Sequence, residues 1–151
     1  MLSPLTLVVC EDGTEYIDRF RRFLAGLLGP GYEFRTARDY VEAEAAVTSA
    51  HALLLDLDFR RAPVDRLIDE QGACSAALDP ARRARLAETQ GILILRRLRA
   101  RGVALPAMLF ADLDDPGQIR YLESILAPLT ITPNRLGLPE IAARIRTFPH
   151  G

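Results

Sequence analysis

Acidic side chains stand in this sequence directly after apolar runs, where they could hold a metal ion and accept a phosphoryl group. The residues concerned are Glu11, Asp12, Asp56, Asp58 and Asp112. If the apolar runs are parallel strands, their carboxyl ends meet at one edge of the sheet and the carboxylates converge there. A hard divalent cation with oxygen ligands, Mg²⁺, would relieve their mutual repulsion. The cation would also neutralise charge during phosphoryl transfer, so Asp56 is the candidate nucleophile.

The elements that must position these residues alternate between strand-like and helical patterns. Short apolar runs predict buried parallel strands, and amphipathic segments between them predict helices. The expected strands cover residues 5–10, 32–36, 51–57, 105–110 and 129–132. The expected helices cover residues 14–28, 41–49, 79–101, 116–126 and 139–148. The predicted fold class is therefore α/β, a doubly wound five-stranded parallel sheet with helices on both faces.

Length and composition predict one domain, residues 1–151, in a reducing compartment. The chain has 151 residues, of which 49% are hydrophobic, and this is enough for one sizeable core. Its formal net charge of −1 excludes nucleic-acid or membrane binding through gross charge. No run is long enough to span a bilayer, and Cys10 and Cys74 do not form a disulfide framework. We expect a cytoplasmic protein that binds neither nucleic acid nor membrane.

Most of the chain resembles bacterial response-regulator receiver domains of the CheY-like superfamily. The similar segments are LVVCEDGTEYIDRFRRFL, GYEFRTARDYVEAEAAV, ALLLDLD, GILILRRLRARGVALPAMLFADLDDP and TPNRLGLPEIAARI. The resemblance implies the flavodoxin-like receiver fold and a role in two-component phosphorelay signal transduction, not an enzymatic one. A histidine kinase or a downstream effector would be the protein partner. No output domain follows residue 139, so we expect a stand-alone receiver.

The resemblance also implies roles for the acidic residues. Glu11 and Asp12 correspond to the pair that holds Mg²⁺, and Asp56 corresponds to the phosphorylated aspartate. Asp58 stands where a backbone carbonyl completes the metal shell. A shift of one residue in the first strand would instead put Cys10 and Glu11 in the pair, and both registers stay open at this stage.

Three positions depart from the receiver pattern. Ala111 replaces the Thr or Ser whose hydroxyl binds the phosphoryl group and turns inward when a receiver is activated. Asp112 replaces a small residue that lets the phosphoryl donor approach. Thr132 replaces the lysine that clamps the phosphoryl group, and the chain has no lysine at all. Arginines that could reach the same space are Arg60, Arg61 and Arg135. These departures indicate a pseudo-receiver in which Mg²⁺ binds weakly or not at all and partner recognition depends little on phosphorylation.

Residues 60–89 form an insertion between the third strand and the part of the third helix that starts near Gly91. Its first part, residues 63–71, could be a short helix, and its second part lengthens the following helix. The inward residues of that short helix would be Val64, Leu67 and Ile68. The insertion could be a lid over Asp56, a docking surface or an idle loop extension.

A docking or homodimer face is also implied by the resemblance. In receivers the fourth helix, fifth strand and fifth helix commonly make such contacts, and they correspond here to residues 116–126, 129–132 and 139–148. The residues expected to take part are Ile119, Arg120, Tyr121 and Leu122.

Two enzyme families share part of the acidic pattern. In haloacid-dehalogenase-type phosphatases Asp56 would be the nucleophile and Asp58 the general acid and base. That family places the motif near the start of its fold, and only Asp114 and Asp115 could supply its later acidic pair. The Glu and Asp-x-Asp of Toprim nucleases and primases are also similar, but the later segments fit receivers better.

Overall fold

The computed structural model describes residues 3–13, 15–74 and 79–148, with residues 15–20 described by their backbone alone. Its centre is one five-stranded sheet in the order β2-β1-β3-β4-β5, and all neighbouring strands are parallel. The strands are β1 (Leu5–Cys10), β2 (Tyr32–Ala37), β3 (Ala52–Asp56), β4 (Ala107–Phe110) and β5 (Leu129–Thr132). The predicted doubly wound parallel sheet is confirmed.

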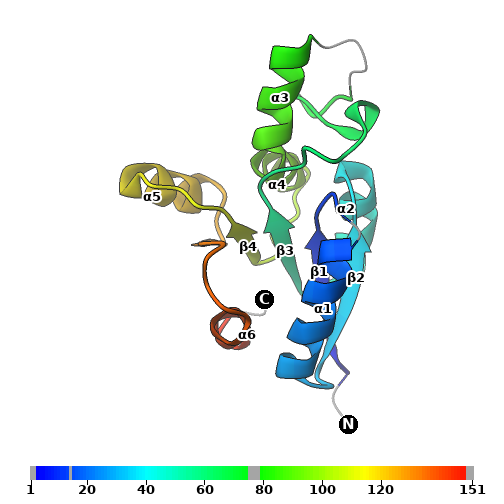
Figure 1. Cartoon of the computed structure of the whole chain (residues 1–151), viewed down its shortest axis with the longest axis vertical. Coiled ribbons are helices and arrows are strands. Elements are labelled where there is room, and N and C mark those ends of the chain that lie inside the picture. The colour runs from blue at the N-terminus through cyan, green and yellow to red at the C-terminus, as the bar shows by residue number, and fades with distance from the viewer. Residues whose placement is uncertain (1–2, 14, 75–78, 149–151) are drawn as a thin grey trace.

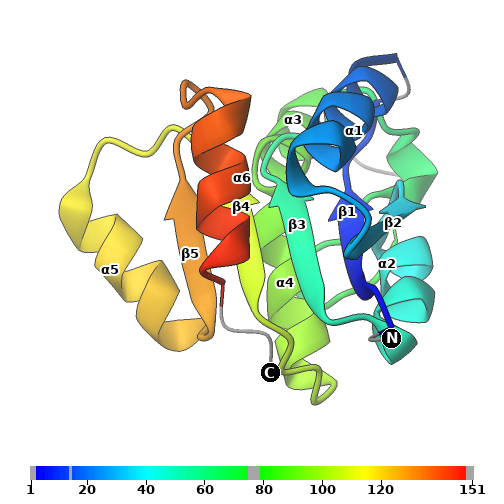
Figure 2. The same cartoon turned by 90° about the horizontal axis from the view of Figure 1, so that it is seen from below.

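Helices cover both faces of the sheet. They are α1 (Glu15–Leu28), α2 (Tyr40–Ala46), α3 (Pro80–Glu88), α4 (Gln90–Ala100), α5 (Pro116–Ile125) and α6 (Leu138–Arg146). Two short 3₁₀ turns are η1 (Val47–Ser49) and η2 (Val64–Arg66). Figure 2 shows α1 and α6 side by side on one face, with α2 and α4 behind the sheet.

The alternation of side chains along each strand divides the core between these two faces. Leu54 of β3 and Met108 of β4 pack with α1 and α6, whereas Leu53 and Leu109 pack on the opposite face. Successive residues of a strand point to opposite faces, so strands covered on both sides need apolar residues at every position. This requirement explains the uninterrupted apolar runs in the sequence.

The expected continuous helix over residues 79–101 is wrong, because the chain breaks into α3 and α4 at Thr89. Asp79 caps α3 as expected, since its Oδ1 accepts the N–H of Arg82 at 2.9 Å. The new start at Gln90 brings Gly91 against β3, where a Cβ atom on Gly91 would lie 2.1 Å from the carbonyl oxygen of Asp56. Close backbone packing at this position therefore redirects the helix.

The insertion follows β3 and extends beyond the carboxyl end of the sheet together with α3 (Figure 1). The expected helix over residues 63–71 is reduced to the single turn η2. Leu67 and Ile68 are buried as predicted, but Val64 is only partly buried. The buried side chain of Gln90 accepts the N–H of Ile68 at 2.8 Å and donates to its carbonyl at 3.1 Å. Leu67 and Ile68 share the core cluster with the sheet, so this part of the insertion packs onto the domain.

Candidate functional site

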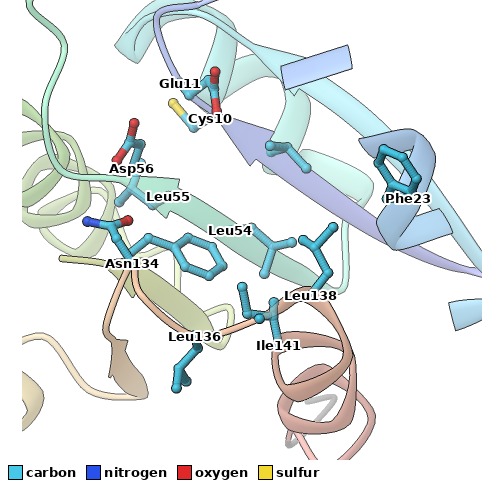
Figure 3. A pocket seen from close by; sticks show the side chains of 13 residues that line it. Cys10, Glu11, Phe23, Leu54, Leu55, Asp56, Asn134, Leu136, Leu138 and Ile141 are labelled. Carbon is cyan, nitrogen blue, oxygen red and sulfur yellow. The ribbon is translucent and has the colours of Figure 1, made fainter. Parts of the chain in front are cut away.

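The strand register brings Glu11 and Asp56 to the same level of the sheet. Cys10 is the register partner of Leu55, and the next residue along the chain is Glu11 after β1 and Asp56 at the end of β3. Alternation turns both acids toward the face that α1 and α6 cover. Figure 3 shows Glu11 and Asp56 close to each other at one end of a pocket. Two of the five acids expected at this edge thus lie level with each other.

The position of Cys10 bears on the choice between the two registers for the acidic pair. Cys10 is fully buried and belongs to the core cluster on the α2 and α4 face. Glu11 is the residue level with Asp56, and Asp12 follows it at the start of the β1–α1 loop. Glu11, rather than the buried Cys10, is therefore the residue that lies beside Asp56.

Burial and mutual repulsion dominate the electrostatics of the site. Burial, followed by the negative charges of Asp56 and Asp12, raises the pKa of the Glu11 carboxyl from its ordinary 4.5 to about 8. Burial also raises the pKa of Asp56 from 3.8 to about 6, helped by the charges of Asp12 and Asp58. The N–H of Leu57 donates to Asp56 Oδ1 at 2.9 Å and opposes that rise. Burial and repulsion therefore disfavour ionising both carboxyls together, and Glu11 holds its proton to a higher pH than Asp56 does.

The first residues of the insertion reach the acidic site. The backbone N–H of Arg61 donates to Asp12 Oδ2 at 2.6 Å. Arg60 pairs through its Nε with Asp58 Oδ2 at 2.6 Å, and its N–H donates to Asp58 Oδ1 at 2.9 Å. The positive charge of Arg61 also lowers the pKa of Glu11, although the burial and repulsion described above outweigh it. Two of the three arginines considered from the sequence thus lie at the site, while Arg135 lies on the exposed turn after β5.

The oxygen donors fit Mg²⁺ in chemistry, because it prefers carboxylate and carbonyl ligands and would relieve the repulsion between Glu11 and Asp56. Within the described ranges, however, no three His, Cys, Asp or Glu side chains are grouped closely enough to hold a metal ion. Asp12 already accepts a hydrogen bond from Arg61. A carboxylate has two oxygens that accept, so this hydrogen bond to Oδ2 leaves Asp12 able to bind a cation through Oδ1.

The three departures from the receiver pattern lie beside the site without supplying a switch group to it. Ala111 is buried, and its N–H donates to the carbonyl of Thr132 at 3.0 Å. Thr132 is fully buried, and its hydroxyl accepts a hydrogen bond from Arg144 Nη1 at 3.4 Å. Asp112 accepts the N–H of Asn134 at 2.9 Å, which joins the loops after β4 and β5. These positions stabilise the loops around the site.

The structure corrects part of the expected docking face. Leu122 is only 4% exposed and packs into the core, so it cannot contact a partner. Ile119 is partly buried against the same core, whereas Arg120 and Tyr121 are exposed. Ile125, which the sequence analysis did not select, is 44% exposed on the same helix. The large hydrophobic side chains exposed on α5 are therefore Tyr121 and Ile125.

Two features of the site were missed by the sequence analysis. Gly91 brings the first turn of α4 against the backbone of Asp56, and its only sequence signal was a glycine inside a helical pattern. Asn134 and Leu136, in the β5–α6 connection, line a pocket of about 360 Å³ next to Asp56. That pocket is built from several distant segments, so no local pattern could have predicted it.

The sequence matches no protein-family model and no curated protein. None of the helices in the described part of the chain is long and apolar enough to cross a membrane.

Solved structures of response-regulator receivers are similar in fold. The receiver domain of the Francisella response regulator 1452 is 14% identical with a TM-score of 0.64, covering 95% of this chain and 94% of that one. The Vibrio cholerae chemotaxis protein CheY4 is 13% identical with a TM-score of 0.63, covering 97% and 100%. The receiver domain of NtrX from Brucella abortus is 16% identical with a TM-score of 0.59, covering 93% and 94%. This protein therefore has the fold of CheY-like response-regulator receiver domains.

Proposed function

We propose that this protein is an atypical receiver domain that acts in two-component signal transduction through protein–protein contacts. One observation carries the proposal: the receiver fold retains Asp56 beside Glu11, while Ala111 and Thr132 occupy the switch positions as buried residues. On this proposal the protein is cytoplasmic, binds no nucleic acid and is not an enzyme. A histidine kinase or an effector is its partner.

Phosphorylation of Asp56 would have little effect on the rest of this molecule. When bound, Mg²⁺ would neutralise the charge of the phosphoryl group, held by Glu11, Asp12, Asp56 and the Asp58 carbonyl. Ala111 has no hydroxyl to turn toward the phosphoryl oxygens. No lysine can bind the phosphoryl oxygens from β5. Phosphorylation of Asp56 would therefore not change the conformation of the α5 surface.

The exposed face of α5 is the proposed docking or homodimer surface. Tyr121 is 59% exposed and Ile125 is 44% exposed, next to the exposed Arg120. Large aromatic and arginine side chains are frequent anchors in protein interfaces. We propose that partners contact these residues whether or not Asp56 is phosphorylated.

The test is to record ¹H–¹⁵N spectra with Mg²⁺ and beryllofluoride, and intact masses after exposure to acetyl phosphate. We expect any spectral shifts to stay in the loops around Asp56 and to leave Tyr121 and Ile125 unchanged. The control is Asp56→Asn, which removes the acceptor and must remove those shifts. Stoichiometric modification of Asp56 that moves the α5 resonances would overturn the proposal and establish a working switch.

The phosphatase reading is not supported by the structure. Asp56 is the last residue of the third strand in chain order, not of the first. Asp58 would have to act as general acid and base. Its carboxylate instead forms an ion pair with the Arg60 side chain and accepts a hydrogen bond from the Arg60 backbone N–H.

A further inference from the structure

A pocket of about 360 Å³ lies between the sheet and helices α1 and α6, and the proposed function uses only the two acids at one end of it. Its walls include Leu54 of β3, Phe110 of β4, Phe23 of α1 and Ile141 of α6. Figure 3 shows Leu136 and Ile141 at one end and the acids of β1 and β3 at the other. The volume falls in the range of pockets that hold small organic molecules.

Strand alternation explains why the pocket has two chemically different ends. Along β3, Leu54 and Asp56 point to the same face, and the register places Phe110 beside Asp56. Leu54 and Phe110 therefore form an apolar floor that runs directly into the carboxylate. Leu136 and Leu138 close the apolar end, where the chain turns from β5 into α6.

The other end is acidic and lacks a counter-charge among the lining residues. Glu11 and Asp56 line it with the amide of Asn134, and none of the described lining residues is basic. Within the described ranges, neither carboxylate forms an ion pair within 4 Å. Arg61, whose charge acts on Glu11, does not line the pocket. A ligand with a cationic group could thus supply the missing charge from inside the pocket.

We propose that this pocket binds a small organic cation with an apolar body. Its ammonium or amidinium group donates hydrogen bonds to Glu11 and Asp56, and its ring or chain lies on Leu54 and Phe110. Hydrogen bonds between charged groups are stronger than neutral ones, especially where water is partly excluded. An anionic ligand of the same shape is repelled by the carboxylates, and a neutral one leaves their charge unpaired.

The test compares three probes of one shape by NMR titration at pH 8.5, where Glu11 and Asp56 are both mostly ionised and the amine is still cationic, in magnesium-free buffer: phenethylamine, 2-phenylethanol and phenylacetate. We expect phenethylamine to shift the amides of Asn134 and Leu138 and to bind about tenfold more tightly than the alcohol, the ratio that one charged contact supplies. Phenylacetate should bind most weakly. Equal affinities for the amine and the alcohol would overturn the assignment of a cation, and no saturable shift at Asn134 or Leu138 with any probe would overturn the site.

Variants separate the pocket from the surface of the protein. The double variant Glu11→Gln with Asp56→Asn should lose the preference for the amine, whereas Asp114→Asn, which changes an exposed acid outside the pocket, should keep it. Leu138→Trp fills the apolar end from a half-buried position and should abolish binding of all three probes. Unchanged binding in Leu138→Trp would show that the probes bind elsewhere. The assay uses neither metal nor phosphodonor, so its outcome is independent of the signalling proposal.

Discussion

At the scale of single residues, Glu11 shows how burial and repulsion set the properties of the site. The residue is 8% exposed and lies level with Asp56, and its carboxyl forms no ion pair within 4 Å among the described residues. A carboxyl with a raised pKa prefers its neutral form in the folded protein. Ionisation of Glu11 therefore costs stability, and the cost depends on pH.

The free energy of unfolding should fall as the pH rises from about 5 to 8. The folded protein holds the proton of Glu11 up to a pKa of about 8, against 4.5 ordinarily, so the stabilisation is full below 4.5 and is lost as the pH rises through 8. Glu11→Gln should remove most of this slope and gain about 1–3 kcal/mol at pH 8.5. Urea denaturation of the wild type and the variant at pH 5, 6.5 and 8.5 measures the free energy of unfolding. The control is Glu33→Gln on the exposed side of β2, and a slope that Glu11→Gln leaves unchanged would contradict the prediction.

Mg²⁺ should stabilise the protein more at pH 8 than at pH 5.5, because the carboxylates must be ionised to bind it. The measurement is the rise in Tm with millimolar MgCl₂, compared with the same concentration of NaCl at matched ionic strength. Asp56→Asn should abolish the rise. A Tm that does not respond to Mg²⁺ at either pH would remove the metal site from the proposal and leave a receiver fold used for binding alone.

At the scale of elements, the contact between α4 and β3 determines where α4 begins relative to Asp56. The N–H of Gly91 donates to the carbonyl of Leu57 at 3.0 Å, and its Cα packs against the backbone of Asp56. Any side chain here would collide with backbone atoms, which cannot rotate out of the way as a flexible side chain can. The first turn of α4 is therefore held directly against the Asp56 peptide.

Gly91→Ala should lower the free energy of unfolding by about 2 kcal/mol or more, because overpacking forces α4 away from β3. The matched control is Gly26→Ala in α1, where an added Cβ meets no atom within 4 Å. That change should be neutral or stabilising by about 0.5–1 kcal/mol, because alanine favours a helix more than glycine does. Both values come from urea denaturation. Equal effects of the two substitutions would refute the tight contact.

At the scale of the whole molecule, the insertion is part of the same core as the sheet. Leu67 and Ile68 are almost fully buried within the cluster that contains Leu53 and Leu109. Gln90 joins the backbone of Ile68 to the start of α4. The insertion and the sheet should therefore unfold together as one cooperative unit.

Ile68→Ala should cost about 2–4 kcal/mol, as expected for a buried aliphatic residue, and should leave a single unfolding transition. Val64→Ala, at a partly exposed position of the same segment, should cost less than about 1 kcal/mol. Urea denaturation followed by circular dichroism and by hydrogen exchange measures both. A second transition, or a negligible cost for Ile68→Ala, would mean that the insertion folds independently of the sheet.

The sequence by itself determined the order of the elements and the acidic edge. The predicted strands 5–10 and 129–132 coincide with β1 and β5. β1 is buried along nearly its whole length, as expected of a mostly apolar strand covered on both faces, whereas β5 alternates aliphatic residues with threonines. The same strand ends predicted the neighbouring positions of Glu11 and Asp56.

Only the tertiary structure decided the details that surround this edge. The helical periodicity of residues 79–101 continues through Thr89, but the contact of Gly91 with Asp56 breaks it. The hydrogen bond from Arg61 to Asp12 spans 49 positions of the chain. The pocket beside Asp56 combines segments that are further apart still. Local sequence patterns indicate which residues are buried. These features depend instead on which segments, far apart in the sequence, come into contact in the folded protein.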